Sequence, residues 1–214
     1  MHMLSSREAA LPLATAGADV TALRSHPPGS PGREEVEEFV RRVYARRYGA
    51  RIASFAPILV SLQDEAGTTI AAAGYRGAQG GPLFLERYLS QPIEAELATH
   101  AARAPSRREI VEIGHLTAER AGGGRQLMVL IGPHLAQQRF RWVVGTLTRE
   151  LRHLLVRMGI TPLALGAADP ASLGEEAADW GSYYAHQPLV LAGELQPALR
   201  RLARRCAPAP GEGA

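Results

Sequence analysis

The chain of 214 residues contains no lysine and no asparagine, and it has a single cysteine. All 24 basic residues are therefore arginines, so no lysine can serve as a Schiff base, a general base or a phosphate ligand. Because Cys206 is the only cysteine, no disulfide can form within the chain. Its polar, proline-rich surroundings are also a poor setting for an activated catalytic thiol.

Long apolar runs are absent as well. No segment approaches the roughly 20 apolar residues that a membrane-spanning helix needs. The N-terminus has no basic region followed by an apolar stretch, which a secretory signal would have. We therefore expect a cytoplasmic protein without stable membrane insertion.

Two kinds of catalytic site are missing from the pattern. The seven histidines are dispersed, and no pair stands at metal-ligand spacing beside a carboxylate motif, so we predict no metal site. The sequence also has no G-x-S-x-G motif, which argues against a nucleophilic serine of the hydrolase type.

The composition that remains fits one globular domain. Hydrophobic residues make up 46% of the chain, which is enough to bury a core, and the net charge is only +3. Residues 1–32 show weak periodicity and end in a run rich in proline and glycine. We predict a flexible arm over 1–32, a single domain over 33–205 and a disordered tail over 206–214.

Hydrophobic periodicity predicts the order of the elements. Residues 34–48 form an amphipathic helix whose arginines fill a solvated face, so nucleic-acid binding is not expected. The predicted strands are 57–62, 68–75, 110–116, 142–146, 162–165 and 188–192. The further predicted helices are 83–89, 92–103, 122–140, 148–158 and 195–205, with a kink or split at Gly132-Pro133 in 122–140. Strands alternate with helices only in the second half, which predicts an α/β (α+β) fold with a mixed, twisted sheet and helices on both faces.

Several motifs carry a resemblance to known families. A-A-G-Y-R at 72–76, L-F at 83–84 and E-I-G-H-L at 112–116 are similar to acyl-homoserine-lactone synthases, members of the GNAT-like acyltransferase superfamily. Those synthases have an arginine after the hairpin, here Arg76, and a Glu-x-x-Arg on the central strand. His115 stands in the place of that second arginine.

A second resemblance covers roughly residues 44–195. The motifs R-Y-G-A (47–50), G-Y-R-x-A (74–78), L-F-L-E-x-Y-L (83–89), E-I-G-x-L (112–116), T-x-T (146–148) and W-G-x-Y-Y (180–184) resemble the family named thermostable hemolysin. Together the two resemblances imply a GNAT-like fold that binds a pantetheine thioester.

Glu112 and His115 are the candidate catalytic residues of the central strand. Side chains alternate along a strand, so the two point to opposite faces unless a bulge intervenes. Glu112 either accepts a proton from an attacking amine or pairs with Arg76 and holds the sheet together. His115 is a base, a contact for the acyl donor, or a hydrogen-bonded histidine at the end of a strand.

A glycine-rich loop follows this strand. Glycines at a helix start expose backbone N–H groups that bind phosphate. The candidate donor-binding residues are Arg120, Gly122, Gly123, Gly124 and Arg125. Arg125 departs from the GNAT pattern, which has a small residue there, and the alternative is a merely flexible loop.

An aromatic segment and two threonines complete the candidate site. Tyr184 is the candidate proton donor to a leaving thiolate, and its aromatic neighbours either line an acyl pocket or pack in the core. Thr148 either contacts the acceptor or caps its helix. The candidate substrate-binding residues are Arg76, Phe84, Leu116, Trp142, Thr146, Thr148, Trp180 and Tyr183.

These features predict an N-acyltransferase. It would move a fatty acyl group from acyl-CoA or an acyl carrier protein to a small-molecule amine such as an amino acid, with no permanently bound cofactor. The alternatives are a membrane-active lytic protein, as the family name suggests, and a catalytically inactive binding module. Lysis caused by a surfactant-like acylated product would reconcile the acyltransferase with the lytic activity that the family name records.

Overall fold

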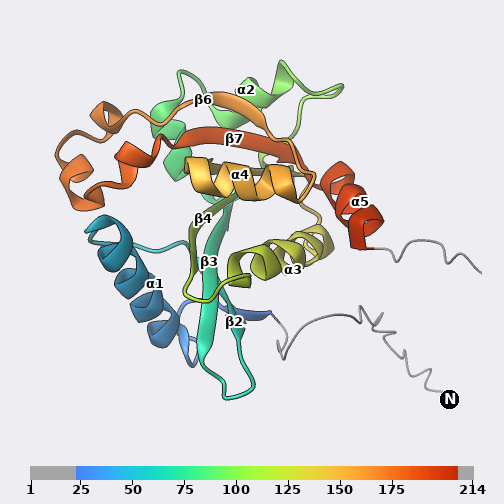
Figure 1. The fold of residues 1–214 in the computed structure, drawn as a ribbon. Helices are drawn as coiled ribbons and strands as arrows, with labels where there is room; N and C mark the ends of the chain where they lie inside the picture. Colours follow the sequence, from blue (N-terminus) through green and yellow to red (C-terminus); the bar gives the residue numbers. More distant parts are fainter. Residues whose placement is uncertain (1–22, 207–214) are drawn as a thin grey trace, which may run out of the picture.

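The computed structural model describes residues 23–206, which form one seven-stranded sheet in the order β1-β2-β3-β4-β5-β7-β6 (Figure 1). The strands are β1 (Arg24–His26), β2 (Ile58–Gln63), β3 (Thr69–Gly77), β4 (Ile110–Ala118), β5 (Trp142–Leu147), β6 (Leu163–Ala167) and β7 (Leu189–Glu194). Every neighbouring pair is antiparallel except β4 and β5, which run parallel. The predicted mixed sheet is confirmed.

Helices cover both faces of the sheet, as the sequence predicted (Figure 1). One face carries α1 (Arg33–Tyr48) and, farther along, α2 (Ile93–Ala98), while α3 (Gly123–Gln137), α4 (Arg149–Arg157) and α5 (Leu195–Cys206) lie on the other. Short 3₁₀ helices fill the connections: η1 (Ala78–Gly80), η2 (Phe84–Tyr88), η3 (Arg107–Glu109), η4 (Pro170–Trp180) and η5 (Tyr183–His186).

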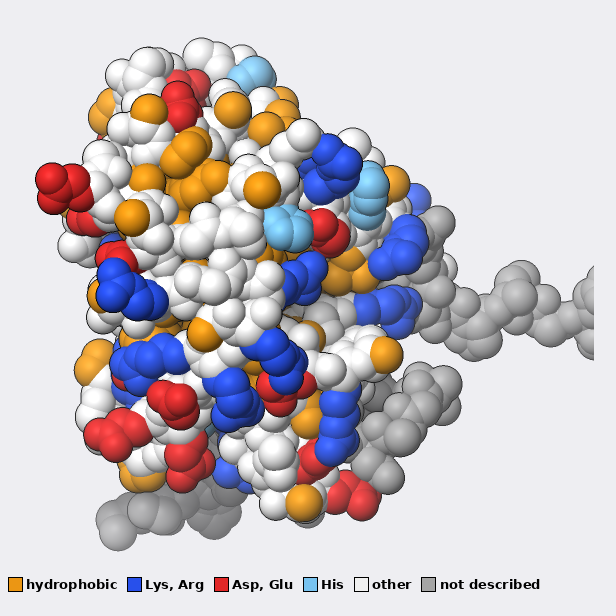
Figure 2. Space-filling model, turned by 60° about the vertical axis from the view of Figure 1, so that its left-hand side comes forward, with side chains coloured by type: hydrophobic (Ala, Val, Ile, Leu, Met, Phe, Trp, Pro, Cys, Tyr) orange, Lys and Arg blue, Asp and Glu red, His pale blue; other side chains and the backbone are white. Residues whose placement is uncertain are grey.

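The helix α1 follows its sequence closely. Its apolar residues recur at helical spacing and are buried, among them Val36, Phe39 and Val40. Gly49 ends it at φ 66°, a left-handed conformation that glycine adopts without strain. Five arginines and four glutamates share its polar face, and Figure 2 shows blue and red side chains interspersed over the lower part of this side of the molecule.

Several elements differ from the sequence prediction, and the helix predicted over 92–103 is the shorter α2 (Ile93–Ala98). The strand β1 falls inside the segment 1–32 that was predicted to be an arm; it pairs with β2, and His26 is buried against Ser61 at 2.9 Å. The helix α3 runs through Pro133 without a split. The predicted helix 83–89 is the 3₁₀ helix η2, because its backbone is held by side chains of other elements. Residues 1–22 and 207–214 lie outside the described residues.

The strands β4 and β5 separate partway along their length. They pair only from Ile110 opposite Trp142 to Glu112 opposite Val144. Beyond that point β4 continues beside β3 to Ala118, and β5 continues beside β7 to Leu147. The sheet therefore opens between its two central strands, and this opening positions the candidate site.

Candidate active site at the β4–β5 divergence

A bulge in β4 places His115 at the opening. The register with β3 runs from Gly74 opposite Gly114 to Ala72 opposite Thr117, so His115 and Leu116 share the single partner position of Ala73. His115 has φ 54°, which is uncommon for a residue with a side chain. The bulge reverses the alternation, and Glu112 and His115 both line the same cavity. The structure thus contains the bulge that the site requires.

The cavity measures about 270 Å³ and lies between β4 and the segments that follow α1, β3 and β6. The residues around it combine a cluster of aromatic rings with ionisable groups. Its walls include Tyr44, Tyr48, Arg51, Ser54, Arg76, Phe84, Tyr88, Glu112, His115, Leu116, Thr146, Glu176, Asp179, Trp180 and Tyr183.

Glu112 is an anchor for η2. Its two carboxylate oxygens accept hydrogen bonds from the backbone N–H groups of Phe84 and Leu85, each at 2.9 Å. Arg76 Nε lies 3.8 Å from the same carboxylate. Burial raises the pKa of Glu112, and the two N–H donors and Arg76 oppose that shift. The carboxylate thereby fixes Phe84 at the wall of the cavity.

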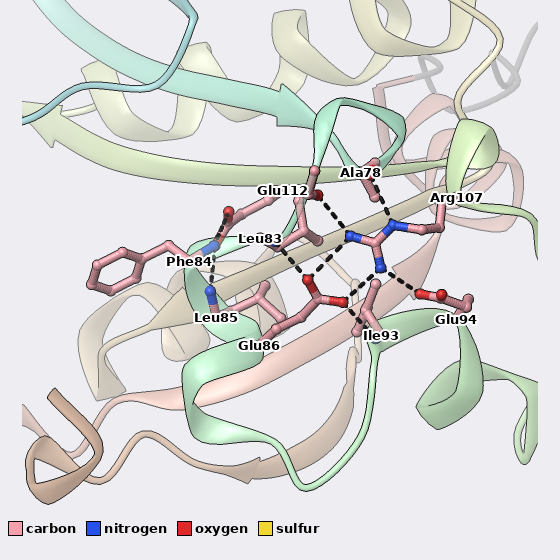
Figure 3. A network of polar contacts seen from close by, with 10 residues as sticks. Ala78, Leu83, Phe84, Leu85, Glu86, Ile93, Glu94, Arg107 and Glu112 are labelled. Carbon is pink, nitrogen blue, oxygen red and sulfur yellow. Dashed lines mark hydrogen bonds and ion pairs between the residues drawn. The ribbon is translucent and has the colours of Figure 1, made fainter.

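Arg107 forms a second set of contacts that holds η2 and its flanking residues in place (Figure 3). Arg107 donates to Glu86 at 2.7 Å and to Glu94 at 2.5 Å. It also donates to the carbonyl oxygens of Ala78 at 2.9 Å and Gly81 at 2.7 Å. The sequence analysis did not identify Arg107 or Glu86, because residues 21 positions apart give no local pattern.

Glu86 joins the two ends of this segment. Its carboxylate accepts from the N–H of Leu83 at 2.6 Å and from the N–H of Ile93 at 2.8 Å. These hydrogen bonds and the Arg107 guanidinium lower the pKa of Glu86 despite its partial burial. Residues 83–93 are therefore a rigid wall, since charged groups bind their backbone at several points.

His115 is held neutral inside the protein. Burial lowers its pKa to about 4, the Ser54 backbone opposes that shift, and Arg76 adds to it. Its Nδ1 is buried and makes no hydrogen bond within the described residues. A buried polar nitrogen without a partner costs free energy unless a ligand or water satisfies it. The imidazole of His115 is thus neutral, and its Nδ1, which lies beside Gly74 of β3, is left without a partner within the described residues.

The two candidate threonines differ in position. Thr146 lines the cavity, and its buried hydroxyl oxygen also makes no hydrogen bond within the described residues. Thr148 is fully buried at the start of α4, and its hydroxyl makes no capping hydrogen bond. Thr146 is therefore the threonine that a bound molecule would meet.

The aromatic residues form one connected cluster at the cavity wall. Trp180 lies 5.2 Å from Tyr183 and 5.6 Å from Phe84, measured between ring centroids. The hydroxyls of Tyr184 and Tyr88 are 2.6 Å apart, and it is Tyr88 that lines the cavity. Burial raises the pKa of both tyrosines. The core-packing and pocket-lining interpretations both hold for this cluster.

Two predicted groups lie away from the cavity. Trp142 is buried in the core beneath α2, and it lines neither of the two cavities described here. The glycine-rich loop stands at the N-terminus of α3, where Gly122 has φ 84° and Arg125 is exposed. Arg120 lies 2.7 Å from Asp64, so its side chain is held at the β2–β3 turn. A role in phosphate binding remains a prediction for this loop.

A second, apolar cavity lies on the opposite face of the sheet. This groove, of about 120 Å³, is bounded by α3, α4 and α5 and by the strands β5 and β7. Glu194 is the one charged residue among the described residues that line it. Ile113 and Leu116 line both cavities, so the groove and the first cavity border the same stretch of β4, where β4 and β5 separate.

The described part of the chain offers neither a metal site nor a membrane span. No group of three or more histidine, cysteine, aspartate or glutamate side chains could hold a metal ion there. Among the helices of residues 23–206, none is long and apolar enough to cross a bilayer.

Comparison with known proteins establishes the family and the fold. A family model described as thermostable hemolysin matches residues 26–199, so the chain belongs to that family. No match was found among curated proteins.

Solved structures share the fold at low sequence identity. The crystal structure of TofI in an apo form has a TM-score of 0.57 and 16% identity, covering 84% of this chain and 97% of that chain. The acyl-homoserine-lactone (AHL) synthase LasI has a TM-score of 0.56 and 14% identity, with coverages of 86% and 95%. FeeM, an N-acyl amino acid synthase from uncultured soil microbes, has a TM-score of 0.60 and 12% identity, with coverages of 86% and 96%. The GNAT-like fold predicted from the sequence is confirmed.

Proposed function

We propose that the protein is an N-acyltransferase that moves a fatty acyl group from a pantetheine thioester to an amine such as an amino acid. The observation that carries this proposal is that two cavities border the same stretch of β4 at the β4–β5 divergence. The apolar groove suits an acyl chain, the polar cavity suits an amine, and the thioester carbonyl would lie between them. The similar structures of an AHL synthase and an N-acyl amino acid synthase support the same chemistry.

In the proposed reaction, the amine nitrogen attacks the thioester carbonyl carbon. A C–N bond forms, and the carbonyl oxygen becomes an oxyanion before the C–S bond breaks. We assign to His115 the acceptance of the proton that the amine loses, because its imidazole is neutral and lines the cavity. At the bulge, His115 and Leu116 share one partner position on β3, so one backbone N–H of these two residues stands outside the strand ladder. We assign that N–H as the hydrogen-bond donor to the oxyanion.

The leaving thiolate requires a proton. Tyr88 reaches the cavity, and its hydroxyl shares a short hydrogen bond with that of Tyr184. We assign proton donation to this pair. Glu112 is a positioning residue in this scheme, because both of its oxygens already accept backbone hydrogen bonds.

The donor is acyl-CoA or an acyl carrier protein, and no permanently bound cofactor takes part. Backbone N–H groups at the start of α3 and the exposed Arg125 support binding of an anionic donor. The same positive charges suit an acidic carrier protein. The two donors are distinguished by supplying each separately with the same acyl chain.

The test is incubation of the purified protein with acyl-CoA or acyl-carrier protein and a mixture of amino acids and other amines, followed by mass spectrometry. We expect an N-acylated product and release of free thiol. His115→Gln should lower the rate by about 10²–10⁴-fold, the usual contribution of a general base. His153→Gln, the same substitution at an exposed histidine of α4 that lines neither cavity, is the matched control. Absence of both product and thioester binding with every donor would reject the proposal.

A further inference from the structure

Positive charge is concentrated on one face of this protein. The helices α3, α4 and α5 together carry eight arginines and one glutamate, whereas α1 on the opposite face carries five arginines and four glutamates. The eight are Arg125, Arg149, Arg152, Arg157, Arg200, Arg201, Arg204 and Arg205. Since the whole chain has a net charge of only +3, this distribution is strongly asymmetric.

The helix α5 contributes most of this charge. Leu195, Leu199 and Leu202 line the groove, and helical spacing directs Arg200, Arg201 and Arg204 to the other side of the helix. These three arginines are exposed, and none forms an ion pair within residues 23–206. An exposed row of arginines without intramolecular partners is suited to an external anionic surface.

The exposed arginines of α1 differ from those of α5, because several of them form ion pairs. Arg42 and Arg46 lie 3.4 Å and 3.2 Å from Glu119, and Arg41 lies 3.2 Å from Glu37. Their charge is offset by neighbouring carboxylates, although their side chains are also exposed. The two helices therefore differ in net charge rather than in arginine content.

An apolar component lies beside the arginines of α5. Val156, at the C-terminal end of α4, is 56% exposed and is the one exposed large hydrophobic residue among those described. Arg157 follows it directly. This end of α4 lies near α5 in Figure 1, and residues of both helices flank the apolar groove. We call these residues of the two neighbouring helices the α5 surface: Val156, Arg157, Arg200, Arg201 and Arg204.

We infer that the α5 surface docks on an anionic lipid bilayer. Arginine heads would meet the lipid headgroups, and Val156 would enter the interface. A nucleic acid or an acidic protein would satisfy the arginines but offers no apolar layer to the exposed Val156. This inference is independent of acyl transfer, because it rests on the surface alone.

The test is co-sedimentation of the full chain with vesicles of phosphatidylcholine alone and of an equimolar mixture with phosphatidylglycerol. We expect binding to the anionic vesicles only, and loss of binding in ~1 M salt, where the screening length falls to about 3 Å. The triple variant Arg200→Gln, Arg201→Gln, Arg204→Gln should bind about 100-fold more weakly, since each arginine near a charged bilayer contributes about fivefold.

The matched control removes the same three charges from the opposite face, as Arg41→Gln, Arg42→Gln, Arg46→Gln. It should retain most of the binding. Val156→Asp provides a second variant at an exposed position that leaves the core intact, and it should also weaken binding. Equal binding to both vesicle types, equal losses in the two triple variants, or binding to duplex DNA in place of vesicles would overturn the inference.

Discussion

Gly145 of β5 faces the carbonyl oxygen of Ile113 so closely that a β-carbon at position 145 would lie 2.7 Å from that oxygen. Real β-carbons essentially never approach that closely, so a side chain there would force the two strands apart. The contact lies one residue beyond Val144, the last residue of β5 that pairs with β4. Glycine at 145 therefore sets how closely the strands approach at the point where they begin to separate.

Gly145→Ala should destabilise the protein by about 1–3 kcal/mol, the usual cost of overpacking a well-packed interior. The free energy of unfolding in urea measures this effect. Gly193→Ala on the adjacent strand β7 is the control, since a β-carbon there meets no atom within 4 Å. Equal stabilities of the two variants would contradict the argument from strand approach.

Arg107→Gln should lower the free energy of unfolding by about 2 kcal/mol, because it removes contacts to two carboxylates and two carbonyl oxygens. Hydrogen exchange should also increase at residues 83–93. Arg103→Gln removes an ion pair with Glu109 whose arginine is 60% exposed, so it should change stability by less than about 1 kcal/mol. Similar exchange in both variants would show that Arg107 does not hold the wall.

His115 makes stability depend on pH. Its pKa is about 4 in the folded protein and about 6.5 in an unfolded chain, so the unfolded state binds more protons between these values. The contribution of His115 to the free energy of unfolding is therefore complete above pH ~6.5. It should fall by about 3 kcal/mol as the pH drops through this window to pH ~4.

Urea titrations at several pH values measure this slope, and His115→Gln should reduce it. His153→Gln, which removes an exposed imidazole on α4, controls for the loss of a histidine. If His115→Gln kept the full wild-type slope, His115 would not be the group responsible.

Thr146→Val should separate stability from activity. Its buried hydroxyl makes no hydrogen bond within the described residues, so replacing it with a methyl group should leave stability unchanged or raise it by up to about 1 kcal/mol. Acyl transfer should fall if this hydroxyl contacts the acceptor. Thermal unfolding and initial rates, compared with those of Thr146→Ser, test the two effects together. A stable variant with unchanged kcat and KM would remove Thr146 from the site.

Local sequence patterns were enough to predict the order and kind of most elements. Hydrophobic periodicity placed α1 and the strands β2 to β7 within a few residues, since each pattern reflects burial on one local face. The sequence motifs also selected Glu112, His115 and Thr146, which line one cavity in the structure. Motifs in order along the chain were sufficient to indicate the family.

The contacts that those residues make depend on long-range folding. A bulge depends on the register with β3, so the shared face of Glu112 and His115 had no signal in the strand itself. The carboxylate of Glu112 is occupied by N–H groups 27 and 28 residues away, and Arg107 reaches Glu86 across 21 residues. Such contacts form when distant segments fold together, and local patterns do not contain them.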